Sequence, residues 1–211
     1  MERICAHLNA FHAYADDPTR DPVEANHYCA HVNDEVRQCI LYDSPYQPAR
    51  ILGIGQISLT LFLQITCPNY SIEYMISPRL YNTLDATEQK LWHSHVFEVK
   101  SGMLIMPKPS AVPESVWEVA ENKEMEEVVQ LYGKVYHLWQ VDRGDALPLG
   151  EPKLMTSYTE AGQMKGGFEK IVGERDQRFG SDWRRKKEVR GHIEEPQVHE
   201  SADWAWKEKR D

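Results

Sequence analysis

The sequence has no apolar run long enough to cross a lipid bilayer. Its most hydrophobic stretch, residues 57–66, is about half of the roughly 20 residues that a spanning helix needs. Residues 1–14 lack both a basic start and an unbroken apolar stretch, so we expect no secretory signal peptide. Any contact with lipid is therefore expected to be peripheral.

The chain is also short of positive charge. Lys and Arg number 24 against 33 Asp and Glu, and the formal net charge is −9. Such a chain is repelled by phosphate backbones and by anionic membrane surfaces, so we expect no nucleic-acid partner. With 211 residues, of which 41% are hydrophobic and 27% charged, the chain is long enough to form one globular domain.

Cysteine is sparse and lacks the spacings of metal-binding or redox motifs. Cys5, Cys29, Cys39 and Cys67 form no Cys-x-x-Cys pair, so we expect reduced thiols in a cytoplasmic protein. The sequence also contains no Walker loop, no dinucleotide-binding glycine fingerprint and no Gly-x-Ser-x-Gly turn. Nothing in it therefore indicates nucleotide binding or serine-hydrolase chemistry.

The hydrophobic pattern predicts an α+β fold, with a small mixed or antiparallel sheet and two or three helices. Residues 23–32 and 36–42 favour two strands of a hairpin, joined by the turn residues Asn33-Asp34-Glu35. Residues 96–106 alternate well enough to predict a further strand, whereas residues 115–132 predict the strongest helix.

The charge pattern divides the chain unevenly. We expect residues 1–180 to form the domain and the charged residues 181–211 to form a flexible tail. The basic run Arg184-Arg185-Lys186-Lys187 could bind acidic partners, but a run of this kind is typical of a solvated helix face.

The residues that could carry chemistry gather in two histidine motifs. His27 and His31 point to one face of a strand, and they would also share a face on a helix. His93 and His95 form a second pair with the same property in an extended segment, and Glu98 follows three residues later.

Imidazole and carboxylate together form a ligand set suited to a divalent transition metal, zinc or iron. We expect His27, His31, His93 and His95 to be the ligands, with Glu98 as a further ligand or a catalytic general base. Two other interpretations stay open. The histidines could act as acid or base without a metal, or they could be packed and hydrogen-bonded for structural reasons.

A third motif, residues 139–145, leads from a predicted strand into a loop rich in Gly and Pro. Its Asp142 is a candidate catalytic residue that could orient a metal-bound histidine. Alternatively, Asp142 forms an ion pair that holds the loop. His137 lies on the same predicted strand, and His12 could add a ligand if the N-terminal segment folds back.

These motifs resemble the oil body-associated proteins, a family filed as a domain of unknown function and found in plants, fungi and bacteria. The similarity covers roughly residues 4–180 and implies a small soluble domain. Plant members of the family are associated with seed oil bodies, but the resemblance implies no particular reaction. The resembling segments are residues 23–33, 37–44, 90–95, 98–102, 139–145 and 147–150.

One segment departs from the family pattern. Residues 49–54 and 73–77 match two halves of a strand that is continuous in the family, and residues 55–72 intervene. Eighteen codons is near the length of a short fungal intron, so we hypothesise a retained intron or a lineage-specific insertion. Sequencing the transcript distinguishes the two. A genuine segment would split a core strand and could form an apolar, lipid-facing hairpin.

Two hypotheses for function follow. The first is a histidine- or metal-dependent enzyme that acts on a small lipophilic molecule. The second is a non-enzymatic protein at the periphery of lipid droplets in the cytoplasm, and it depends on the family resemblance. The sequence indicates no substrate and no oligomeric state.

Overall fold

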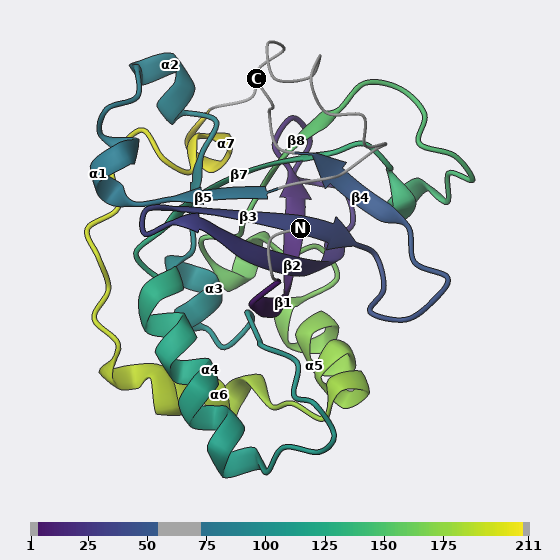
Figure 1. Ribbon diagram of the computed structural model, residues 1–211. Helices are drawn as coiled ribbons and strands as arrows, with labels where there is room; N and C mark the ends of the chain where they lie inside the picture. Colours follow the sequence, from purple (N-terminus) through teal and green to yellow (C-terminus); the bar gives the residue numbers. More distant parts are fainter. Residues whose placement is uncertain (1–3, 55–72, 209–211) are drawn as a thin grey trace.

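The computed structural model describes residues 4–54 and 73–208 (Figure 1). In these ranges the strands are β1 (Ala6–Tyr14), β2 (Val23–Asn33), β3 (Val36–Tyr42), β4 (Ile51–Ile54), β5 (Glu73–Ile76), β6 (His93–Ser94), β7 (Tyr132–His137) and β8 (Lys153–Thr156). The α-helices are α1 (Pro78–Tyr81), α2 (Ala86–Gln89), α3 (Val96–Lys100), α4 (Glu114–Val128), α5 (Phe168–Phe179), α6 (Trp183–Val189) and α7 (Trp204–Lys207).

The expected α+β class is confirmed, but the helices outnumber the two or three that were predicted. Four of them, α1, α2, α3 and α7, have only four or five residues. A segment of that length completes little more than one turn, so it shows no helical period in the sequence.

The sheet is antiparallel throughout and closes on itself. The pairing runs β2-β1-β8-β7-β4-β3, and β3 returns to β2. The last of these pairings is the predicted hairpin, which is thereby confirmed. β5 pairs with both β3 and β7, and β6 pairs with β7. In Figure 1 the sheet lies between two groups of helices, with α4, α5 and α6 together on one side.

β1 carries no alternating pattern because it is covered on both faces. All of its residues except His7 are buried. Leu8 belongs to the main core, which also includes side chains of α4, whereas Phe11 packs in a second cluster with Phe168 and Trp183. Because polar residues such as Asn9 and His12 are buried in β1 as well, the strand shows no alternation of apolar and polar residues.

β4 and β5 lie on one continuous line of register. Gly53 of β4 pairs with Leu41, and Glu73 of β5 pairs with Cys39, two residues along β3. In an unbroken strand, the second residue after Gly53 would pair with Cys39, and Glu73 occupies that position. The pairings of β4 and β5 with β7 show the same two-residue step from Gly53 to Glu73. Residues 55–72, with the hairpin expected there, lie outside the described residues.

Cys29 and Cys39 form a disulfide, which corrects the expectation of reduced thiols. The two residues stand directly opposite each other in β2 and β3. Strand pairing, rather than a Cys-x-x-Cys spacing, brings them together, so the sequence motifs gave no sign of it. Cys5 is a free, exposed cysteine, and Cys67 lies outside the described residues.

The expected flexible tail is packed against the domain as far as residue 208. Lys186 on α6 pairs with the buried Glu121 on α4. The Arg190 side chain is 0% exposed and donates hydrogen bonds to the carbonyls of Val99 and Leu104, at 3.1 and 2.8 Å. The high charge of this segment led to the expectation of solvent exposure. Composition alone does not reveal that its basic side chains have partners inside the protein.

Candidate metal centre

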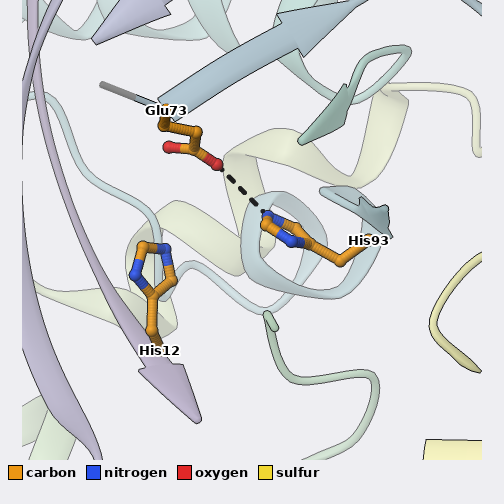
Figure 2. A group of neighbouring side chains, drawn as sticks. All are labelled: His12, Glu73 and His93. Carbon is orange, nitrogen blue, oxygen red and sulfur yellow. Dashed lines mark ion pairs between the residues drawn. The ribbon is translucent and has the colours of Figure 1, made fainter. Parts of the chain in front are cut away.

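Seven imidazole and carboxylate side chains converge in the interior of the protein. They come from five strands and from the start of α3, and their exposed fractions lie between 0% and 3%. Figure 2 shows three of them, His12, Glu73 and His93, with their polar ends directed toward one another. The full set is His12, His27, Glu73, His93, His95, Glu98 and His137.

Short distances link four of these side chains one after another. His12 Nε2 lies 3.3 Å from His27 Nε2, and His27 Nε2 lies 3.2 Å from Glu73 Oε2. Glu73 Oε1 lies 3.3 Å from His93 Nε2. Ligand atoms about 2.0 Å from a tetrahedral ion are about 3.3 Å from each other. One ligand atom from each of His12, Glu73 and His93 lies within 4.8 Å of the other two.

Glu73 is the centre of the cluster. Its side chain is 1% exposed, and imidazoles of three histidines lie within ion-pair distance of its carboxylate. Even so, neither of its oxygens accepts a hydrogen bond of proper geometry from any described residue. A buried carboxylate among imidazoles, with no donor well aligned to it, is compatible with metal ligation.

Gly133 on β7 leaves the space that the cluster occupies. A Cβ at this position would lie 2.6 Å from Glu73 Oε1, 2.7 Å from His93 Nε2 and 2.9 Å from His95 Cε1. Real Cβ atoms do not approach other atoms this closely, so any other residue here would displace the polar ends of the cluster. The glycine is therefore required by the site and not by a turn.

A small cavity of about 10 Å³ lies within the cluster. It is large enough for about one water molecule and far smaller than a site for an organic ligand. Five of the polar side chains line it, together with three apolar ones; the lining residues are Leu8, His12, His27, Glu73, Met75, His95, Glu98 and Leu104. The cavity therefore fits a single ion or a single water.

The electrostatics of the cluster favour an ionised Glu73 and neutral His12 and His137, but a protonated His95. Burial by itself raises the pKa of Glu73, but the nearby imidazoles, first among them His27, hold that pKa well below its usual range. Burial lowers the pKa of His12 well below its ordinary value and lowers that of His137 to about 3. Burial also opposes the protonation of His95, but the two neighbouring carboxylates outweigh it and raise its pKa to about 9.

The site takes His95 and Glu98 from α3, where a strand had been predicted over residues 96–106. His95 is the N-cap of the helix, and Glu98 lies three residues on, so both side chains share a helix face. His95 Nδ1 donates to the Leu131 carbonyl at 2.8 Å. Ser157 Oγ donates to Glu98 Oε2 at 2.7 Å, so both side chains are oriented by second contacts.

The C-terminal segment also positions the site. The Asp203 carboxylate accepts hydrogen bonds from Ser94 N at 2.7 Å and from Ser94 Oγ at 2.8 Å. Ser94 stands between His93 at the start of β6 and His95 at the N-cap of α3, so this contact fixes the segment that carries both imidazoles. A segment expected to be mobile thus holds the second histidine motif in place.

The structure brings four of the six candidate site residues together and leaves two outside. His31 lies at the exposed end of β2, because residues four apart on a strand share a face but lie about 13 Å apart. Asp142 accepts hydrogen bonds from Tyr14 Oη and from the Arg20 guanidinium, both at 2.5 Å. Its partners match the alternative interpretation, an ion pair that holds the loop.

Glu73 is the site residue that the sequence reasoning missed. It stands alone in Glu73-Tyr74-Met75-Ile76, where a strand with one carboxylate attracts no attention. Its inward position depends on the register of β5 against β3 and β7. His12 and His137, which were secondary candidates, also lie in the cluster, with His12 Nδ1 3.1 Å from His137 Nε2.

Fold and site together define an α+β protein with a closed antiparallel sheet and a buried histidine–carboxylate cluster. Residues 1–194 match the family described as "Protein of unknown function (DUF1264)", and the chain belongs to this family. Among the described residues, no helix is long and apolar enough to span a membrane. No solved structure matches the chain.

The relatives of the chain confirm the resemblance to the oil body-associated proteins. Oil body-associated protein 1A of Zea mays is 40% identical over 96% of this chain and 74% of the relative. Oil body-associated protein 1B of Arabidopsis thaliana is 39% identical over 94% of this chain and 70% of the relative. Oil body-associated protein 2C of Arabidopsis thaliana is 36% identical, over 99% and 76% respectively.

Proposed function

We propose that this protein binds one divalent transition metal, zinc or iron, with His12, Glu73 and His93 as its central ligands. The observation that carries the proposal is the Glu73 carboxylate, which is buried among imidazoles and accepts no hydrogen bond from the described residues. His27 contacts His12 and Glu73 at 3.3 and 3.2 Å, but it is not one of the three residues whose ligand atoms all lie within 4.8 Å of one another. Two imidazoles and one carboxylate with an open position are a ligand set known for both ions.

The geometry supports metal binding better than turnover. A divalent ion in the cluster would join β1, β5 and β6, and it would supply Lewis acidity to whatever molecule occupies its open position. The cavity of about 10 Å³ admits an ion or one water and leaves no room for a lipophilic substrate. Glu98, which is 3.8 Å from His95, remains the candidate general base of the enzyme hypothesis.

Paired substitutions test the ligand set. The protein and its variants are stripped with a chelator and titrated calorimetrically with Zn²⁺ and, without oxygen, with Fe²⁺. We expect Glu73→Gln and His93→Ala to weaken binding at least about tenfold. His31→Ala is the matched control, because it removes the same side chain outside the cluster and should leave affinity unchanged. Equal affinities for His93→Ala and His31→Ala would overturn the proposal.

A second candidate concerns location, and the names of the relatives favour it. Those proteins are named as oil body-associated, so we propose that this chain also associates peripherally with lipid bodies. Flotation of cell extracts tests this directly. Recovery of the protein with the floating lipid fraction supports the candidate, and its complete recovery in the aqueous fraction removes it.

A further inference from the structure

A second cavity lies on the outer side of α3. It has a volume of about 580 Å³ and is lined by residues of α3, α5 and α6 and of the short segment 161–163. Its walls include Phe97 from α3, whereas the adjacent Glu98 lines the inner cavity of the metal centre. Helix α3 therefore separates the two cavities, and nothing in the outer one belongs to the histidine cluster.

The walls of this outer pocket are mostly apolar and include three aromatic rings. The ring centroids of Phe97 and Phe168 are 5.7 Å apart, and those of Phe168 and Trp183 are 5.1 Å apart, nearly perpendicular. Edge-to-face packing of this kind fixes the rings in place. A volume of several hundred cubic ångströms bounded by fixed rings is typical of a preformed site for an organic molecule.

One wall is made of residues with little or no side chain. Gly162 and Gly167 both line the pocket, and a Cβ built at either would meet no described heavy atom within 4 Å. The space beside them is therefore open rather than filled by neighbouring side chains. The positive φ of 92° at Gly167 requires glycine, but Gly162 has no such constraint.

The charged residues of the pocket leave it with positive charge. Lys170 and Lys187 are exposed and form no hydrogen bond or ion pair with the described part of the chain. Glu169, the acidic residue among the lining side chains, pairs with Arg184 at 2.7 Å. Two unpaired ammonium groups on a chain with a net charge of −9 form a local site for an anion.

We propose that this pocket binds a free fatty-acid-type ligand, that is, an alkyl chain ending in a carboxylate. The chain packs against Phe97, Phe168 and Trp183, and the carboxylate is bound by Lys170 and Lys187. Lysine suits this arrangement because its hydrocarbon stem packs on apolar surface while its ammonium group stays in water. The proposal does not depend on the metal, so chelated protein should bind the ligand equally well.

Calorimetry with dodecanoate below its micelle concentration tests the pocket. We expect saturable binding of one molecule per chain, at least about tenfold tighter than binding of dodecanol, which has the same alkyl chain without the charge. Gly162→Leu should abolish binding by filling the open wall. The double variant Lys170→Ala/Lys187→Ala should remove the preference for the acid, whereas Lys123→Ala, an exposed lysine on α4, should not.

The outcomes separate this proposal from its alternatives. Equal affinity for dodecanoate and dodecanol overturns the anionic part, and absence of saturable binding overturns the pocket. The protein could instead sediment with phosphatidylcholine vesicles that contain dodecanoate and yet not bind the free acid. That result would assign the binding to a lipid surface and would also overturn the proposal. Circular dichroism of each variant establishes that it is folded, and the lysine variants keep the test valid if Gly162→Leu does not fold.

Discussion

Deleting residues 55–72, so that Ile54 joins Glu73, should yield a folded protein with the histidine–carboxylate cluster intact. β4 and β5 already lie on one line of register against both β3 and β7. The deletion removes an eighteen-residue connection whose two ends lie at adjacent register positions, and the loop-closure cost of such a connection is roughly 2.5 kcal/mol. With a urea m-value of about 2 kcal/mol per M, the midpoint should rise by about 1 M.

A deletion that is shorter by one residue provides the matched control. Removing residues 55–71 leaves one extra position, and a one-residue slip turns every later side chain of the strand to the opposite face. Glu73 would then point away from His27 and His93. We expect this variant to unfold at lower urea concentration and to bind no metal. If both deletions behave alike, or if deletion of 55–72 abolishes folding, the register argument is wrong.

Three further predictions concern single sites. Gly133→Ala should weaken metal binding at least about tenfold in calorimetry, because its Cβ would overlap the polar ends of the cluster; unchanged affinity would contradict the geometry. Metal-free protein should lose stability toward urea as the pH falls from about 6.5 toward 3, because burial lowers the pKa values of His12 and His137 in the folded state. In that pH range only the unfolded chain takes up the two protons, so each histidine can lower the free energy of unfolding by about 1.4 kcal/mol per pH unit. A free energy of unfolding that does not change with pH would refute this prediction. Lys186→Met should cost roughly 2 kcal/mol of unfolding free energy by removing a charged partner from a buried carboxylate, and the exposed Lys187→Met should change it by less than about 0.5 kcal/mol.

Sequence periodicity predicted the elements that are long or half-buried. The hairpin of β2 and β3 has turn residues between two strands rich in β-branched and aromatic residues, and both signals are local. Helix α4 is long enough to show a helical spacing of apolar residues, although only Met125 and Val128 of them are buried and Val116 and Val119 are exposed. β1, which is buried on both faces, and the helices of four or five residues give no comparable period.

The histidine site could be predicted in part because its two motifs are local. His93 and His95 are brought together by a spacing that can be read directly from the chain. Glu73 enters the site through strand register, and His12 and His137 through long-range pairing, so no local pattern marks them. The error over His31 arose because sharing a face does not imply proximity, since distance along a strand grows by about 3.3 Å per residue.

The C-terminal segment shows why composition misled. Lys186 and Arg190 are buried with Glu121 as a shared partner, and Asp203 accepts two hydrogen bonds from Ser94, which stands between His93 and His95. Each charge is satisfied by a residue far away in the sequence. A charged composition therefore predicted solvent exposure where the structure has internal ion pairs.

The metal content of the protein tests the central claim most directly. The protein is purified without an affinity tag, analysed for transition metals, and analysed again after chelation and reconstitution with Zn²⁺ or Fe²⁺. We predict about one equivalent of bound metal per chain after reconstitution, lost in Glu73→Gln. Less than about a tenth of an equivalent in the purified protein, with no uptake on reconstitution, would contradict the account.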